Sequence, residues 1–392
     1  MNVRKKVALA FSGGLDTSFC VKYLSQDRNL EVHSVFINTG GFSVAEEKEI
    51  EKRAIDLGVE SHENINVSEQ YYQQCIRFMV YGNMMRNRNY PMSVSSERTF
   101  QAMAVAEYAS REGIEILAHG STGAGNDQVR FEMIFQVLVP EMEVIAPIRE
   151  LSLSREEEVA YLKKSGVEDS FQKHAYSINQ GLWGTSVGGR ETLTSSEGLP
   201  EEAYPSQLER NKPEKISLKF EKGQLAGGIE SIRELNKIAS AFAIGRGIHV
   251  GETVLGIKGR VGFEAAAPTV IIRAHQELEK HTLGKWQAYW KDQLSEWYGM
   301  MLHEGHYLDP VMRNIETFLE ETQKYVSGKI FIILRPYTFE VTGIESENDL
   351  MKASGATYGE LHEGWSGEDV KGFTKILGNP VSIYNSIHPF SS

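Results

Sequence analysis

A glycine-rich stretch close to the N-terminus contains the residue types that hold phosphate groups. Residues 7–24 run from an apolar segment through a Ser-Gly-Gly turn into apolar positions at helical spacing, which predicts a strand, a tight loop and a helix. Backbone N–H groups at the start of such a helix attract anions, and Ser12, Thr17 and Ser18 add hydroxyl donors. Because the lysine of a Walker loop is missing, we expect this loop to hold pyrophosphate rather than to serve a γ-phosphate kinase.

A second polar stretch, residues 119–132, follows the apolar run 114–118. It combines three glycines, two hydroxyls, two side-chain amides, the carboxylates of Asp127 and Glu132 and the guanidinium of Arg130. A guanidinium can meet both oxygens of a planar carboxylate, and a carboxylate can orient an amine. We therefore predict a binding site here rather than a purely structural loop. The alternative is that Arg130 only pairs with Glu132 or with another surface carboxylate.

Strands and helices alternate around these two stretches. Strands are predicted at 31–37, 63–67, 114–118 and 144–147, and helices at 45–57, 68–85, 98–112 and from Ser154 onward. This rhythm is typical of an α/β fold with a doubly wound parallel sheet. Ligands bind at the carboxyl ends of the strands in such sheets, where residues 12–16 and 37–40 would lie. We place a domain boundary after Gly166, which divides the chain into residues 1–166 and 167–392.

The second half has mixed patterns and predicts an α+β domain. Strands are expected at 215–220 and 329–339, helices at 229–242, 276–302 and 310–326, and an irregular excursion at 193–213. An aromatic set at helical spacing is expected to be a packing stripe, of a kind that also suits subunit contacts: Trp286, Trp290, Trp297 and Tyr298.

Composition is that of a globular protein of 392 residues, with 41% hydrophobic and 24% charged residues. A formal charge of −12 opposes binding to nucleic acid or to an anionic membrane by long-range attraction. The two cysteines form no metal-binding or disulfide pattern, and the N-terminal apolar run is too short for an export signal or a membrane span. We therefore expect a cytoplasmic protein without a protein-held metal, a nucleic-acid partner or a membrane partner.

Both polar stretches resemble known signatures. The string Ser-Gly-Gly-Leu-Asp-Thr-Ser at 12–18 resembles the pyrophosphate loop of the ATP pyrophosphatase superfamily, and its flanking residues look like the argininosuccinate synthase family. Residues 119–132 resemble the second signature of that family, and 176–186 and 254–260 resemble two further segments. The resemblance implies that ATP drives ligation of citrulline to aspartate in arginine biosynthesis, through a citrullyl-AMP intermediate, with release of AMP and pyrophosphate. It also implies Mg²⁺ carried on the nucleotide, a homotetramer, and a synthetase and multimerisation role for residues 167–392.

The same resemblance implies three sets of binding residues. ATP would be bound by Ala10, Phe11, Ser12, Gly13, Gly14, Leu15, Asp16, Thr17, Ser18, Ile37 and Gly120. Aspartate would be bound by Thr122, Asn126 and Asp127, and citrulline by Tyr90, Ser95, Asn126, Arg130, Ser177 and Ser186. No general base can be named from the sequence.

The chain departs from the family pattern at several positions. The family usually has glutamate where Gly251 falls and tyrosine where Phe263 falls, so Glu252 is a candidate for the first role. Residues 179–181 and Ala124 also differ. Two alternatives therefore stay open: another adenylating ATP pyrophosphatase, disfavoured by the acidic charge, and a nucleotide sensor without turnover, disfavoured by the intact Asp127 and Arg130.

Overall fold

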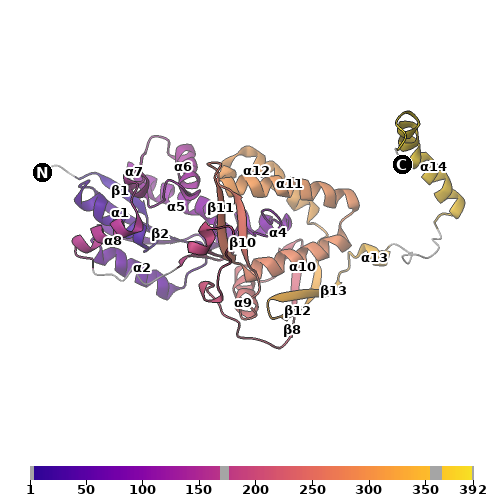
Figure 1. Ribbon diagram of the computed structural model, residues 1–392, viewed down its shortest axis with the longest axis horizontal. Coiled ribbons are helices and arrows are strands. Elements are labelled where there is room, and N and C mark those ends of the chain that lie inside the picture. Colours follow the sequence, from indigo (N-terminus) through magenta and orange to yellow (C-terminus); the bar gives the residue numbers. More distant parts are fainter. Residues whose placement is uncertain (1–3, 168–175, 354–363, 391–392) are drawn as a thin grey trace. The chain divides into compact units, whose positions relative to one another are not determined.

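The computed structural model describes residues 4–167, 176–353 and 364–390. The chain forms two compact units, Met1–Glu347 and Asn348–Ser392. The first unit begins with a five-stranded parallel sheet of order β3-β2-β1-β4-β5 (Figure 1). Its strands are β1 (Lys6–Ala10), β2 (Glu31–Asn38), β3 (Ser61–Asn66), β4 (Ile116–His119) and β5 (Glu143–Ile145).

Helices cover both faces of this sheet because alternate residues of its strands point to opposite sides. Val7 and Leu9 of β1 pack in one apolar cluster with α1 (Leu15–Gln26) and α2 (Val44–Asp56). Ala8 points the other way, into a second cluster that includes α5 (Glu97–Arg111). The predicted doubly wound parallel sheet is confirmed.

The strand order has its reversal at β1. This strand pairs with β2 on one side and with β4 on the other, both in parallel. Chain connections therefore leave in opposite directions from the carboxyl ends of β1 and β4, which opens a crevice there. The remaining helices of this part are α3 (Ser68–Tyr71), the π-helical turn η1 (Tyr72–Ile76), α4 (Arg77–Tyr81), α6 (Asp127–Leu138), α7 (Pro147–Leu151) and α8 (Arg155–Lys164). Ser154 and Glu157 form a capping box at the start of α8, where a helix was expected to begin.

Two antiparallel sheets follow in the same unit, with orders β10-β11-β7-β6 and β13-β12-β8-β9. Their strands are β6 (Ser177–Gly181), β7 (Gly184–Gly188), β8 (Glu214–Glu221), β9 (Gln224–Leu225), β10 (Arg246–Glu252), β11 (Lys258–Glu264), β12 (Gly328–Arg335) and β13 (Thr338–Glu345). The helices are α9 (Gly228–Ser240), α10 (Ala266–Thr282), α11 (Lys285–Glu304) and α12 (Pro310–Thr322), with short 3₁₀ turns η3 (Arg190–Leu193), η4 (Glu201–Ala203) and η5 (His306–Leu308). The mixed α and β content expected for the second half is therefore present.

Two expectations for this half were wrong. The helical pattern 276–302 is divided between α10 and α11, which are separated at Leu283 and Gly284. The tryptophans of α11 are not a packing stripe, because Trp286, Trp290 and Trp297 are 67%, 56% and 60% exposed. Only Tyr298 is buried, and it lies on the face that the helix turns toward the core together with Lys291, Ser295 and Leu302.

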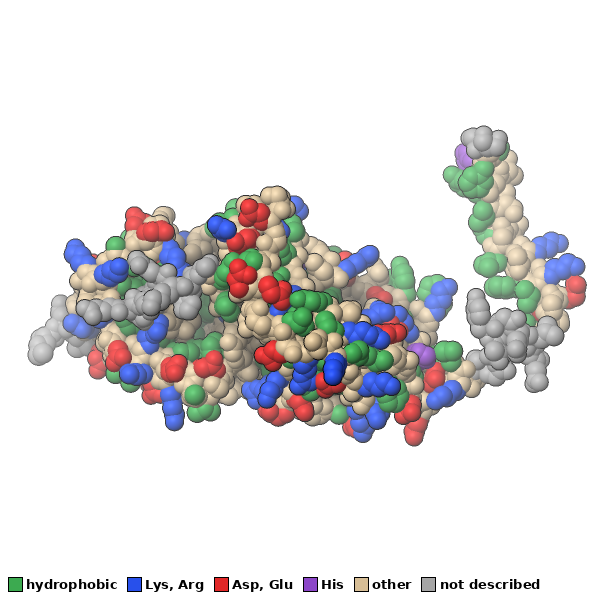
Figure 2. Space-filling view, turned by 60° about the horizontal axis from the view of Figure 1, so that its bottom comes forward, with side chains coloured by type: hydrophobic (Ala, Val, Ile, Leu, Met, Phe, Trp, Pro, Cys, Tyr) green, Lys and Arg blue, Asp and Glu red, His purple; other side chains and the backbone are tan. Residues whose placement is uncertain are grey.

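The second unit contains α13 (Leu350–Ala353) and α14 (Gly367–Ile387). Apolar side chains recur along α14 at intervals of three and four residues, and none of its residues is buried. Figure 2 shows them as green atoms along this helix. They are Val370, Phe373, Ile376, Leu377, Val381, Ile383, Tyr384 and Ile387. In the part of the chain that the structure describes, no helix combines the length and apolar character needed to cross a bilayer.

Candidate active site

The loop after β1 leaves the first turn of α1 open to a ligand. Gly14 occupies the N-cap position, so the first N–H groups of the helix receive no capping bond from a side chain. Ser12 and Thr17 lie with their hydroxyl oxygens 3.1 Å apart, and Ser18 Oγ donates to the Gly14 carbonyl at 2.7 Å. Gly13 is the residue with a positive φ, +74°, whereas Gly14 has φ −78°. Arg53 of α2 holds the turn by donating to the Gly13 carbonyl at 2.9 Å.

The apolar members of the predicted ATP set are part of the scaffold. Phe11, Leu15 and Ile37 are 3%, 6% and 5% exposed and belong to the apolar core. Their side chains therefore pack in the core, and only their backbone groups can contact a nucleotide. Ala10 is half-buried at the carboxyl end of β1.

Asp16, in the first turn of α1, hydrogen-bonds to the carboxyl group of Glu158 in α8. Burial raises the pKa of Asp16. Burial and the neighbouring charge of Asp16 raise the pKa of Glu158 to about 8. The two carboxyl groups therefore share a proton near pH 7, which lowers the negative charge beside the phosphate loop.

Gly120 brings the loops after β1 and β4 together. A Cβ atom at this position would lie 3.1 Å from Thr17 Cγ2 and 3.4 Å from the Asp16 backbone carbon, so a larger residue would separate them. Gln128 holds the second loop by donating to the carbonyls of Gly123 and Gly125 at 2.6 and 3.2 Å. Both predicted loops thus form one edge of the crevice.

Asp127 lies between two arginines. Arg98 Nε donates to its Oδ2, and Arg130 Nη1 donates to its Oδ1, each at 2.8 Å. Burial alone would raise the pKa of Asp127, but the charges of Arg98 and Arg130 outweigh it and lower that pKa to about 2. The carboxylate therefore stays ionised throughout the physiological range.

Arg130 is buried and keeps one donor group free. Its side chain is 4% exposed, and its Nε donates to the carbonyl of His303 at 2.9 Å. Its Nη2 has no hydrogen-bond partner among the described residues. Glu132 pairs instead with Arg149 at 2.5 Å and His119 at 3.2 Å. A buried, unsatisfied guanidinium nitrogen is costly unless a ligand meets it, which makes it the strongest single sign of an anion site here.

Two further members of the predicted citrulline set, Ser95 and Tyr90, contact His303, whose carbonyl binds Arg130. Ser95 Oγ lies 3.2 Å from His303 Nδ1, and the Tyr90 ring is 6.4 Å from that of His303. Phe263 contacts the Tyr90 ring at 5.2 Å and faces Ser186 across the β7–β11 ladder. Burial, with the charges of Arg130 and Arg86, lowers the pKa of His303 to about 2, so this ring is neutral.

The other predicted residues lie further out. Asn126 Oδ1 accepts from the Val254 N–H at 2.9 Å and so fixes the β10–β11 turn against the second loop. Ser177 is exposed on the edge strand β6, and Thr122 is exposed in the second loop. Within the described residues, no side-chain hydrogen bond or ion pair links these two to Arg130.

Glu252 does not take the place of the glutamate that is missing at Gly251. Neighbouring residues of a strand point to opposite faces, and Glu252 forms an exposed ion pair with Lys258 at 2.8 Å. The idea that this carboxylate moved into the site is therefore wrong.

Sequence reasoning missed Arg98, Glu158, His249 and His303. Arg98 is in α5, Glu158 in α8, His249 in β10 and His303 near the end of α11. None belongs to a local motif, and only the tertiary fold brings them to the two loops. A signal existed for Arg98 alone, since it follows Ser95 by one helical turn at the start of a predicted helix.

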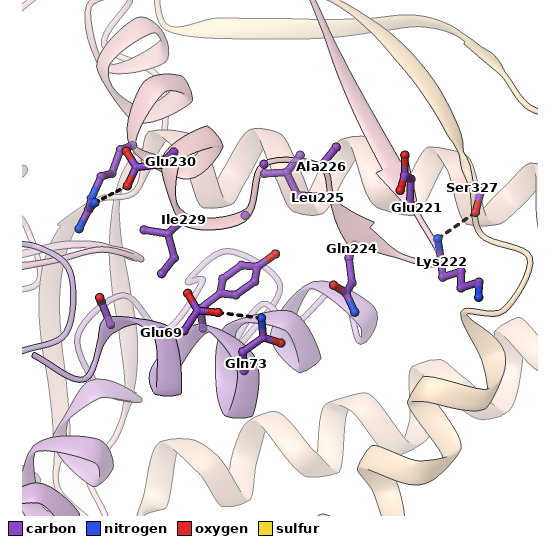
Figure 3. A pocket seen from close by; sticks show the side chains of 15 residues that line it. Glu69, Gln73, Glu221, Lys222, Gln224, Leu225, Ala226, Ile229, Glu230 and Ser327 are labelled. Carbon is purple, nitrogen blue, oxygen red and sulfur yellow. Dashed lines mark hydrogen bonds and ion pairs between the residues drawn. The ribbon is translucent and has the colours of Figure 1, made fainter.

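A polar groove of 940 Å³ lies elsewhere in the first unit, between α3 and the β8–β9 hairpin (Figure 3). Carboxylates of Glu69, Glu221 and Glu230 line it together with Lys222 and Arg233. Glu69 accepts from Gln73, and the Lys222 N–H donates to Ser327 (Figure 3). None of the predicted site residues lines this groove.

The parallel sheet, with both ligand loops at its point of reversal, defines a nucleotide-binding α/β protein. Comparison with family models identifies one family within this class of proteins. "Arginosuccinate synthase N-terminal HUP domain" matches residues 6–168, and "Arginosuccinate synthase C-terminal domain" matches residues 176–384. The chain belongs to the argininosuccinate synthase family.

Curated relatives agree over nearly the whole chain. The argininosuccinate synthase of Dictyoglomus turgidum is 36% identical over 391 residues, covering 97% of this chain and 98% of the relative. That of Xanthomonas campestris pv. campestris is 34% identical, covering 98% and 99%. That of Pyrococcus furiosus is 33% identical, covering 98% and 95%.

Proposed function

We propose that this chain is an AMP-forming carbon–nitrogen ligase that joins L-citrulline to L-aspartate in arginine biosynthesis. Family membership over both matched segments supports the reaction class. The observation that carries the substrate assignment is the buried Arg130, whose Nη2 has no hydrogen-bond partner among the described residues. An amino acid supplies the planar carboxylate that such a group binds.

ATP would lie with its phosphates against the loop after β1. The uncapped first turn of α1 offers backbone donors, and Ser12 and Thr17 add hydroxyls. Among the described residues, no group of three or more His, Cys, Asp or Glu side chains could hold a metal ion. We place Mg²⁺ on the phosphates of the nucleotide, which is how this ion usually enters phosphoryl-transfer sites.

The first chemical step is attack of the citrulline ureido oxygen on the α-phosphate, which forms citrullyl-AMP and releases pyrophosphate. This oxygen is a weak nucleophile, so positioning contributes more than a strong base. Arg130 would hold the citrulline carboxylate, with Tyr90, Ser95 and Ser186 around it, and Ser177 and Asn126 at its outer side.

The aspartate amine then displaces AMP from the activated ureido carbon. Thr122, Asn126 and Asp127 would hold this second substrate, because Asp127 stays ionised and can orient an amine. Asp127 already binds two arginines, so an amine must share its carboxylate oxygens with Arg98 and Arg130. Each oxygen has a second lone pair for this purpose.

Assembly as a homotetramer is part of the proposal. The exposed apolar side chains of α14 and the exposed tryptophans of α11 are surfaces that a further copy of the chain would cover. We also propose that residues 1–166 form the nucleotide-binding domain and 167–392 the synthetase and multimerisation domain. A cytoplasmic location, without nucleic-acid or membrane partners, stays a prediction.

Pyrophosphate release from ATP tests the reaction. We expect release to require citrulline, and argininosuccinate to form only when aspartate is also present. Release that ignores both amino acids would indicate a different ATP pyrophosphatase, and ATP binding without release would indicate a sensor.

A further inference from the structure

The side chain of His249 fills the space beside Gly251. Gly247, His249 and Gly251 alternate along β10 and therefore share one face of the strand. A Cβ atom at Gly251 would lie 2.6 Å from His249 Nε2, so the imidazole occupies the place where a larger residue at 251 would project. The histidine and the glycine thus form a matched pair.

His249 belongs to the group of side chains that forms the proposed citrulline pocket around Arg130. Its ring stacks on Tyr90 with the centroids 4.9 Å apart, and it lies 6.3 Å from the ring of His303, whose carbonyl binds Arg130. His249 is 5% exposed, and its Nδ1 is buried without a hydrogen-bond partner in the described part of the chain. The pocket therefore contains two unsatisfied polar atoms, His249 Nδ1 and Arg130 Nη2.

Charge in this pocket suits a carboxylate but not an ammonium. Its arginines are Arg86, Arg98 and Arg130. Asp127 pairs with two of them, and Glu304 pairs with Arg86 at 3.8 Å. Glu97, next to Arg98, is buried, and burial raises its pKa to about 8, so it is mostly protonated at pH 7. Burial and the charge of Arg86 lower the pKa of His249, so its ring is neutral at pH 7. An ammonium buried here would lose its hydration and would have to share Asp127 with Arg98 and Arg130.

We propose that His249 determines the specificity of this pocket and selects a ureido acid whose α-nitrogen is uncharged, as in an Nα-acylated citrulline. The inference rests on the proposed ligase function. Arg130 holds the carboxylate as before, and the amide at the α-nitrogen meets His249 Nδ1. An amide offers both an N–H donor and a carbonyl acceptor, so it satisfies either tautomer of the imidazole. An ammonium offers only charged donors.

The test compares citrulline with Nα-acetylcitrulline in pyrophosphate release from ATP, with aspartate present. We expect kcat/KM of the wild-type protein to be at least about tenfold higher for Nα-acetylcitrulline. His249→Leu removes the hydrogen bond, so we expect the KM for the acylated substrate to rise roughly two- to tenfold. The double change His249→Ala with Gly251→Glu supplies a carboxylate and frees the space for it, and should turn the preference toward citrulline.

Val250→Ala is the matched control, because this side chain is on the opposite face of β10 and 53% exposed. It should leave the preference unchanged. A wild-type kcat/KM for citrulline equal to or higher than that for Nα-acetylcitrulline would overturn this inference and leave the proposed ligase intact. Absence of release with either ureido acid would remove the ligase assignment and this inference together. The comparison of the two substrates with the wild-type protein tests the inference even if a variant fails to fold.

Discussion

Asp127 and Arg130, three residues apart on α6, form an ion pair with 2.8 Å between Oδ1 and Nη1. The pair fixes the guanidinium so that Nη2 is left without a partner among the described residues. Two groups that the sequence assigns to different substrates are therefore one unit. The effects of substitutions at these two residues should therefore be coupled.

Arg130→Lys is expected to raise the citrulline KM by roughly ten- to a hundredfold, since one charge-assisted hydrogen bond is worth roughly 1.5–3 kcal/mol. A lysine cannot bind the His303 carbonyl, Asp127 and a ligand in the fixed geometry of a guanidinium. ATP affinity should barely change, because the phosphates would rest on the loop after β1. Steady-state kinetics measure the citrulline KM, and calorimetry on the same preparation measures the ATP affinity.

Arg335→Lys is the control for this change, because Arg335 forms a surface ion pair with Glu340. Such pairs contribute about 0–1 kcal/mol, so its kinetics should match the wild type. Equal loss of citrulline and ATP binding in Arg130→Lys would mean that Arg130 is structural and that the carboxylate is bound elsewhere.

Valine substitutions at Gly13 and Gly14 should act differently, although the two glycines are adjacent. At Gly14 the backbone suits any L-residue, and an added Cβ would meet only Ser12 Oγ, at 3.4 Å, so the fold should survive. Its side chain would stand where a phosphate approaches the helix start, and ATP affinity should fall at least about tenfold. Gly13→Val instead strains a residue at φ +74° and should lower the thermal midpoint. Unchanged ATP affinity in a folded Gly14→Val protein would contradict the phosphate assignment.

Local patterns predicted most of the fold and both loops. The alternation of strands and helices indicated the parallel sheet, and the glycine-rich stretch after β1 lies at the carboxyl edge of the sheet as expected. These features depend on residues close in sequence, where turn chemistry and periodicity carry information. The prediction for the tryptophans of α11 was wrong because periodicity identifies an apolar face of a helix. It does not indicate whether the same chain or another copy covers that face.

The partners of the site residues could not be predicted in this way. Arg130 is joined to His303, 173 positions later, and Asp16 to Glu158 in another helix. The sequence indicated only that the family's glutamate is missing at Gly251. His249, which fills the space beside Gly251, belongs to no motif and could not be recognised. Such pairings arise from tertiary packing, which single-sequence patterns do not encode.

Phe373→Asp in α14 should lower the molecular mass measured by sedimentation or light scattering. Phe373 is 63% exposed within a long apolar stripe, and a charge there would oppose its burial against another copy. Ser382→Asp introduces the same charge outside the apolar set of this helix and should leave the mass unchanged. If Phe373→Asp keeps the wild-type mass, this helix is not the assembly surface.

Glu158→Gln should change how stability depends on pH. In the folded wild-type protein the pKa of Glu158 is raised to about 8, against 4.5 in the unfolded chain, so the folded state holds one more proton between these values. Stability therefore falls as pH rises from about 4.5 to about 8. Glutamine has no such titrating proton and can still donate a hydrogen bond to Asp16. The stability of the variant relative to the wild type should therefore increase as pH rises across this window. At pH 8 we expect its thermal midpoint to be higher than that of the wild type by on the order of 2–4 °C. Glu97, whose pKa burial also raises to about 8, is present in both proteins and cancels in the comparison. Thermal unfolding of both at pH 5, 6.5 and 8 measures the difference, and curves that stay parallel would mean that Asp16 and Glu158 do not share a proton.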